Sequence, residues 1–179
     1  MGGTLNEELS REAATSGIRR AVETGTYYGD SAIKLSRIFE RVETIELSRR
    51  LALRSWLRLL RYRNVHLRLG DSSKLLKPSS EPTLYWLDSH WSGGNTAGAD
   101  RPCPLLPEIQ ATSPGTFGDW YLIDDARLFT GRLDPGLDPV QWPTIDQIRE
   151  LIAVVRPGYE VSVRKDLDVI VVSPSAHGF

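Results

Sequence analysis

Two periodicities of apolar and polar residues divide this chain. Seven segments carry the continuous or alternating apolar pattern of β-strands, and three carry apolar residues every three or four positions, as amphipathic helices do. The predicted strands are 17–25, 42–48, 64–72, 83–90, 119–127 and the two halves of 159–172. The predicted helices are 30–41, 49–63 and 144–155.

Strands that alternate with helices predict a parallel sheet with helices on both faces. The charged turn inside 159–172 predicts a hairpin, which adds antiparallel pairing at one edge. We therefore expect an α/β fold: a doubly wound, Rossmann-like, mostly parallel seven-stranded sheet with a C-terminal antiparallel hairpin. One domain would span 1–179, after a polar N-terminal segment at 1–16.

Two segments rich in Gly, Pro and polar residues interrupt the pattern, at 91–118 and 130–143. Each follows the carboxyl end of a predicted strand, where open α/β sheets bind their ligands. We expect both segments to be loops over a binding site.

Composition narrows the function classes. The formal net charge of −1 argues against a protein that binds nucleic acid by neutralising phosphates. The single cysteine, Cys103, excludes an intrachain disulfide and a cysteine zinc cluster. No apolar run is long enough for a membrane span, and the N-terminus lacks the apolar core of a signal peptide. We expect a cytoplasmic protein without nucleic-acid or membrane partners.

The stretch VETGTYYGDSA connects the first predicted strand to a helix. Glycines let the backbone approach a ligand closely, and the following helix N-terminus offers free N–H groups. Tyr27 stands where the dinucleotide fingerprint has its second glycine, which disfavours a pyrophosphate. The alternative is a purely structural turn. The candidate binding residues are Glu23, Gly25, Tyr27, Gly29 and Ser31.

Glu46 and Asp71 end the second and third predicted strands. Glu46 could accept both hydroxyls of a ribose, or it could cap the helix that follows at Ser48. Asp71 could accept from an adenine amino group, or it could be the N-cap of a turn. Because acids follow three successive strands, their joint placement favours a binding site.

A second set of acids follows the fourth and fifth strands. Asp88, Asp124 and Asp125 would converge at one edge and repel one another, and a divalent cation such as Mg²⁺ would relieve that repulsion. The alternative is that one aspartate caps a helix and another pairs with Arg127. His90 is a candidate general base near neutral pH, or a structural histidine.

With these residues in view, the chain resembles a known superfamily. VETGTYYGDSA closely resembles the first motif of class I S-adenosylmethionine-dependent methyltransferases, in the form found in catechol O-methyltransferase-like enzymes. The three aspartates resemble the magnesium site of the metal-dependent O-methyltransferases. LDSHWSGG also resembles the macrocin and sugar O-methyltransferases and the cephalosporin-hydroxylase-like group.

The resemblance implies a role for each candidate. Glu23, Gly25, Tyr27 and Ser31 would line the methionine part of the cofactor, Glu46 would hold the ribose, and Asp71 with Ser72 would flank the adenine. Gly29 belongs to the same turn, and Asp88 would border the cofactor as well as the metal. Asp88, Asp124 and Asp125 would hold Mg²⁺.

The implied function is Mg²⁺-dependent O-methylation of a small hydroxylated acceptor. The catechol-type enzymes have a lysine base where this chain has Trp91, so His90 is the candidate in its place. The alternatives are a hydroxylase-like enzyme on the same fold and a non-catalytic cofactor-binding or scaffold protein. Few residues precede the first strand, so a second subunit of a homo-oligomer could complete the substrate site.

Overall fold

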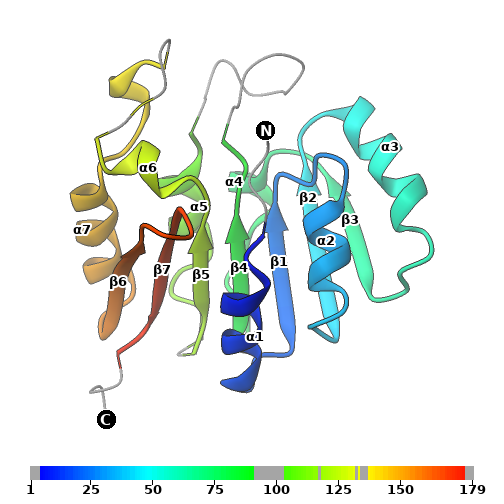
Figure 1. Ribbon diagram of the computed structural model, residues 1–179, viewed down its shortest axis with the longest axis horizontal. Helices are drawn as coiled ribbons and strands as arrows, with labels where there is room; N and C mark the ends of the chain where they lie inside the picture. The colour runs from blue at the N-terminus through cyan, green and yellow to red at the C-terminus, as the bar shows by residue number, and fades with distance from the viewer. Residues whose placement is uncertain (1–4, 91–102, 117, 132, 134–136, 176–179) are drawn as a thin grey trace.

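The computed structural model describes residues 5–90, 103–116, 118–131, 133 and 137–175 of the chain. Seven strands form one sheet in the order β3-β2-β1-β4-β5-β7-β6 (Figure 1). The first five strands along the chain pair in parallel, and β7 pairs antiparallel with both β5 and β6. The predicted doubly wound sheet with its C-terminal hairpin is therefore confirmed. The strands are β1 (Arg20–Thr24), β2 (Arg41–Glu46), β3 (Val65–Leu69), β4 (Thr83–Leu87), β5 (Trp120–Ile123), β6 (Tyr159–Arg164) and β7 (Val169–Pro174).

The helices cover both faces of this sheet. One apolar cluster joins a face of the central strands to α1 and α2, and a second joins the other face to α5, α6 and α7 (Figure 1). Central strand β4 is buried at all five positions, which explains its continuous apolar run. The helices are α1 (Glu7–Thr15), α2 (Asp30–Leu35), α3 (Arg49–Leu59), α4 (Ser72–Leu75), α5 (Leu105–Ala111), α6 (Ala126–Phe129) and α7 (Ile145–Val155), with a 3₁₀ turn, η1, at Pro139–Gln141.

Several predicted boundaries were wrong. The helix predicted over 30–41 ends at Leu35, and the helix predicted over 49–63 ends at Leu59. The N-terminal segment forms α1, whose Leu9 and Ala13 pack into the core. Its apolar stripe is short and set among charged residues, which is why the sequence was interpreted as merely polar.

The segment expected to be a loop at 91–118 contains α5. Pro104 and Pro107 suggested a loop, but proline is tolerated in the first helical turn because the N–H groups there have no helical partner. The segment at 130–143 contains η1. Residues 91–102, 117, 132 and 134–136 lie outside the described residues, and they include Trp91.

The register brings the carboxyl ends of β1, β2, β4 and β5 to the same edge of the sheet. The predicted site residues follow these strands. Within the described parts of the chain, no helix combines the length and apolar character needed to cross a bilayer.

Candidate functional site

The turn after β1 is held tightly against the end of β4. Gly25 has a φ of 83°, and its N–H donates to the carbonyl of Ile45 at 2.9 Å. A Cβ on Gly25 would overlap the carbonyl oxygen of Asp88. Gly29, also at positive φ, is the N-cap of α2, and Ser31 lies half-buried in the first turn of that helix. The turn is therefore a compact connection that only glycine permits at position 25.

Glu46 closes this turn from the end of β2. Its carboxylate oxygens accept from the backbone N–H groups of Tyr27 and Ser48, each at 2.8 Å. Burial raises the pKa of Glu46, and these two hydrogen bonds oppose that rise. The structure thus brings together two predicted cofactor residues, and it also shows the contact with the start of α3 that was the alternative interpretation.

Glu23 lies beneath the turn and is 1% exposed. Its carboxyl group accepts from the hydroxyl of Thr44, which is itself 2.6 Å from the hydroxyl of Thr26. Burial raises the pKa of Glu23 to about 8, and the negative charge of Glu46 contributes to the rise. Glu23 is therefore mostly protonated at neutral pH.

The side chains of Tyr27 and Asp71, two predicted cofactor residues, contact neighbouring residues of the protein. The Tyr27 ring is 43% exposed and packs against Tyr28, with ring centroids 4.1 Å apart. Asp71 is the N-cap of α4 and accepts from the backbone N–H and the hydroxyl of Ser73, so the helix-cap alternative describes its contacts. Ser72, the other predicted adenine neighbour, is buried in the first turn of α4.

Carboxylates gather at the edge of the sheet beyond this turn. Burial, followed by the charges of Asp124, Glu23 and Asp125, raises the pKa of Asp88 well above its usual value. Burial and the charge of Asp125 raise the pKa of Asp124 to about 6. One oxygen of Asp124 is buried and has no hydrogen-bond partner among the described residues.

Asp125 differs from these two acids because both of its carboxylate oxygens contact neighbouring side chains, those of His90 and Arg127. His90 Nε2 lies 2.7 Å from Asp125 Oδ2, and Arg127 bridges Asp125 Oδ1 to Asp168. Burial on its own would raise the pKa of Asp125, but the bonds from His90 and Arg127 hold it below its usual value. His90 Nδ1 lies 3.7 Å from Asp88 Oδ1.

These contacts bear directly on the predicted magnesium site. Both oxygens of Asp125 already have cationic or N–H partners, as the Arg127 alternative anticipated. Across the described part of the chain, no three His, Cys, Asp or Glu side chains are arranged to hold a metal ion. The structure therefore does not assemble Asp88, Asp124 and Asp125 into a three-carboxylate site, and as arranged these residues do not fit Mg²⁺.

Two residues of this edge were missed by the sequence analysis. Glu108 on α5 is fully buried and accepts from the hydroxyl of Ser89 at 2.6 Å. Asp168, in the β6–β7 turn, accepts from the backbone N–H of Arg127 at 2.8 Å. An apolar stripe at Leu105 and Ile109 could have revealed the helix that carries Glu108. Nothing local in the sequence marks Asp168.

Comparison with known proteins supports the fold assignment. No protein-family model and no curated protein matches this chain in sequence. Among solved structures, it is similar to a putative caffeoyl-CoA O-methyltransferase from Staphylococcus aureus, with a TM-score of 0.65, 16% identity, and coverage of 96% of this chain and 83% of that one.

Two further similar structures were solved with cofactor or its product. The Streptomyces achromogenes O-methyltransferase TomG, involved in tomaymycin synthesis and in complex with SAM, gives a TM-score of 0.60 at 22% identity, covering 93% of this chain and 77% of that one. The Bacillus cereus O-methyltransferase in complex with SAH gives 0.58 at 21% identity, covering 96% and 82%. The chain therefore has the fold of the class I, S-adenosylmethionine-dependent O-methyltransferases.

Proposed function

We propose that this chain is an S-adenosylmethionine-dependent methyltransferase that methylates a hydroxyl group of a small acceptor. The observation that carries the proposal is the turn after β1, where Gly25, Tyr27 and Glu46 converge within the methyltransferase fold. His90 lies beyond this turn, two residues after Asp88, whose backbone contacts Gly25. A cofactor turn and a candidate base thus lie at one edge of the sheet.

The residues of the turn fit an adenosyl cofactor by their chemistry. In the proposal, Glu46 exchanges its present backbone contacts for the ribose hydroxyls, and Glu23, Gly25, Tyr27, Gly29 and Ser31 border the methionine part. Asp71 and Ser72 flank the adenine, and Asp88 borders the sulfonium. When bound, the cofactor supplies an activated methyl group.

His90 is the base of the proposal, and Asp125 is its positioning residue. In the proposal, the imidazole donates its Nε2–H to the anionic Asp125 and keeps the lone pair on Nδ1. Nδ1 lies 3.7 Å from Asp88 Oδ1, and burial together with the charge of Asp124 raises the pKa of Asp88. Nδ1 would take the acceptor's proton as the oxygen attacks the methyl group.

Magnesium dependence stays a prediction of the sequence, which the arrangement of Asp125 does not favour. Asp88 and Asp124 alone offer two ligands, and a third would require one oxygen of Asp125 to exchange its contact with His90 or with Arg127 for the metal. A cytoplasmic location, a homo-oligomer, and the lack of nucleic-acid and membrane partners also stay predictions.

Calorimetric titration with S-adenosylhomocysteine tests cofactor binding directly. We expect saturable binding by the wild type. The affinity of Glu46→Gln should fall by at least about tenfold, because the charged carboxylate that would accept hydrogen bonds from the ribose hydroxyls is replaced by a neutral amide. Glu40→Gln, an exposed acid paired with Arg19, is the matched control and should bind like the wild type. A wild type that does not bind would overturn the proposal.

Product mass then separates the candidate activities. Incubation of the wild type with S-adenosylmethionine and a panel of phenols and sugars should yield a product heavier by one CH₂ group. A product heavier by one oxygen atom would indicate the hydroxylase-like alternative. Cofactor binding without turnover of any acceptor would indicate the non-catalytic alternative.

A further inference from the structure

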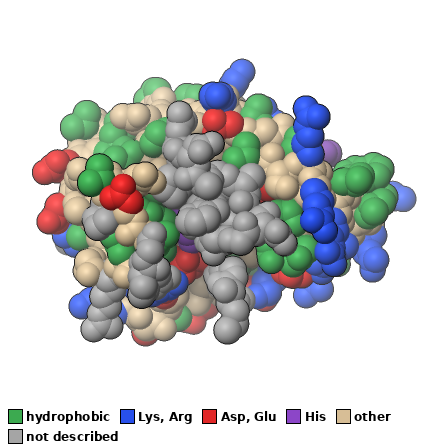
Figure 2. Space-filling view, turned by 90° about the horizontal axis from the view of Figure 1, so that it is seen from above, with side chains coloured by type: hydrophobic (Ala, Val, Ile, Leu, Met, Phe, Trp, Pro, Cys, Tyr) green, Lys and Arg blue, Asp and Glu red, His purple; other side chains and the backbone are tan. Residues whose placement is uncertain are grey.

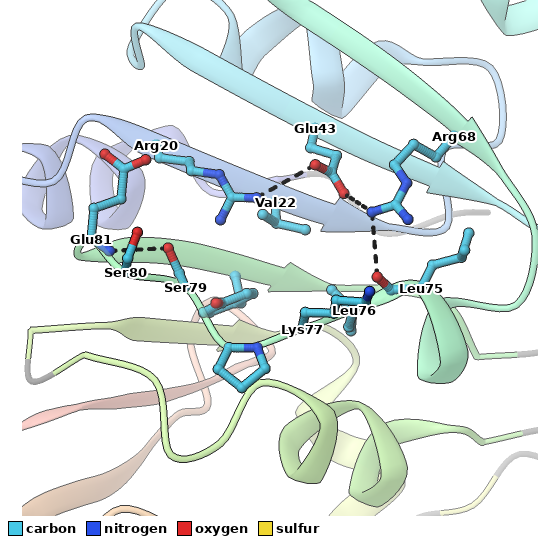
Figure 3. A pocket seen from close by; sticks show the side chains of 12 residues that line it. Arg20, Val22, Glu43, Arg68, Leu75, Leu76, Lys77, Ser79, Ser80 and Glu81 are labelled. Atoms are coloured by element: carbon cyan, nitrogen blue, oxygen red, sulfur yellow. Dashed lines mark hydrogen bonds and ion pairs between the residues drawn. The ribbon is translucent and has the colours of Figure 1, made fainter.

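A pocket separate from the candidate site lies between the segment 75–81 and strands β1, β2, β3 and β4. Figure 3 shows the side chains that line it. Its volume is about 250 Å³, enough for a small ligand. The first residue of β1, Arg20, lines it, whereas the cofactor turn follows the last residue of the same strand. Polar and charged side chains provide much of its wall: Arg20, Glu43, Arg68, Lys77, Ser79, Ser80 and Glu81.

The pocket exists because no long helix covers this part of the sheet. Between β3 and β4 the chain forms only the single turn of α4, and then runs as the irregular segment LKPSSEP (76–82). The strands beneath carry charged residues where a covered sheet would carry apolar ones: Arg20 on β1, Glu43 on β2 and Arg68 on β3. The sequence thus forms a polar hollow where the fold would otherwise place a helix.

Positive charge exceeds negative charge in the hollow. One carboxylate, Glu43, is shared by two guanidinium groups, at 3.4 Å from Arg20 and 2.7 Å from Arg68 (Figure 3). Glu81 pairs with Arg41, which is not part of the lining. Lys77 has no ion pair or hydrogen bond within the described part of the chain. One of the two arginine charges and the lysine charge therefore remain uncompensated.

The floor of the pocket provides a donor without a partner. Tyr85 lines the pocket and is fully buried, and its hydroxyl has no hydrogen bond to any described residue. An unpaired buried hydroxyl costs free energy, so its presence calls for a partner. Its ring stacks on Tyr121, with centroids 5.0 Å apart, which fixes the position of the hydroxyl oxygen.

We propose that this pocket binds a small phosphate, with Arg20, Arg68, Lys77 and the Tyr85 hydroxyl as its donors. A phosphate dianion matches the two uncompensated positive charges, and its tetrahedral oxygens accept from several directions at once. A planar carboxylate would reach fewer of these donors. The proposal does not depend on the proposed methyltransferase activity, because none of the four donors belongs to the cofactor turn.

Calorimetric titration with inorganic phosphate, and separately with glycerol 3-phosphate, tests the pocket. Ionic strength is matched with sodium chloride, so that screening alone produces no signal. We expect saturable 1:1 binding, tighter for the ester if the ligand is a phosphorylated metabolite and tighter for free phosphate if it is the anion itself. A wild type that binds neither probe overturns the proposal.

The variants Tyr85→Phe and Lys77→Met test the assigned donors. Each should weaken phosphate binding by about tenfold, since a hydrogen bond to a charged group is lost. Tyr85→Phe should leave the free energy of unfolding unchanged or raise it, because it removes an unpaired hydroxyl. Arg149→Met, on the exposed surface of α7, is the matched control.

The outcomes against the proposal are equally definite. Phosphate affinities in Tyr85→Phe and Lys77→Met that equal the affinity of Arg149→Met would place the anion elsewhere. The free energy of unfolding in urea, measured on the same variants, should stay within about 1 kcal/mol of the wild-type value, so a lost phosphate signal is not the result of unfolding.

Discussion

Glu23 shows how strongly the interior of the first turn opposes charge. Its pKa of about 8 in the folded chain lies above the ordinary value of 4.5, which the unfolded chain is expected to retain. Between these two values the folded chain binds one more proton than the unfolded chain does. Stability is therefore lost as the pH rises through this window.

The variant Glu23→Gln should remove that dependence. We expect the variant to gain stability relative to the wild type as the pH rises from 5 to 8, by at most about 1.4 kcal/mol per pH unit. Urea unfolding at several pH values measures the gain. Glu40→Gln provides the control, and parallel curves for Glu23→Gln and the wild type would contradict the pKa of Glu23.

Asp125 should matter for turnover rather than for cofactor binding. The variant Asp125→Asn lacks the anion that accepts from the N–H of His90 Nε2. The imidazole is then free to carry its proton on Nδ1, and in that tautomer Nδ1 cannot accept the proton of the acceptor hydroxyl. We expect kcat to fall by about 100-fold or more, as when a comparable anion is removed from a histidine base. The affinity for S-adenosylhomocysteine should stay the same.

Asp166→Asn, at an exposed position of the β6–β7 turn, is the control for Asp125→Asn. Both rates are measured on an acceptor found by the product-mass screen. An unchanged kcat in Asp125→Asn would mean that the His90–Asp125 contact is structural only.

Helix α3 shows why periodicity alone did not identify its faces. Leu51, Ala52, Ser55 and Leu59 are buried, whereas a second apolar stripe is 47–63% exposed. Both stripes recur at helical spacing, so periodicity alone does not show which of them is buried. The exposed stripe is Leu53, Trp56, Leu57 and Leu60.

Two leucines of α3 separate the faces by experiment. Leu59 packs against Gly29 of the turn after β1, so Leu59→Ala should lower the free energy of unfolding by about 2–5 kcal/mol. Leu57 is 59% exposed, so Leu57→Ala should change it by less than about 0.5 kcal/mol. Urea denaturation compares the two, and equal losses would contradict the orientation of the helix.

Long, periodic elements were predictable, and short ones were not. The capping box of Thr144 and Gln147 at the start of α7 was evident because both partners lie within one turn. The single-turn helices α4 and α6 carry too few residues to show a period. Their positions depend on tertiary contacts, such as the bond from the α6 backbone to Asp168.

At the scale of the whole molecule, the predicted order of the strands indicates which acids lie at the same edge of the sheet. It does not indicate what those acids bind. Parallel register places Asp88 and Asp124 on neighbouring strands, as expected from alternating strands and helices. The partner of Arg127, however, comes from the C-terminal hairpin, and only the fold brings it there. The sequence offered the pairing of Asp125 with Arg127 as an alternative to the magnesium site, but it did not show that His90 contacts the other oxygen of Asp125.

Methyl transfer should accordingly proceed without a divalent cation. We expect the rate in excess EDTA to equal the rate in Mg²⁺, since Asp125 is already engaged by His90 and Arg127. The control is a metal-dependent O-methyltransferase assayed in the same buffers. A rate that EDTA abolishes and Mg²⁺ restores would show that Asp125 exchanges its partners for a metal.

Gly25 has a consequence for any survey of tolerated substitutions. Because its position is blocked by the backbone at the end of β4, a side chain there would disturb two central strands whether or not a cofactor binds. A library selected only for folded protein should therefore reject variants at Gly25 as firmly as one selected for activity. Tyr27, in the same turn, has a side chain that is 43% exposed, and substitutions there would separate the two selections. Invariance at Gly25 thus records how the chain packs, and Tyr27 is the position whose tolerance would report on the ligand.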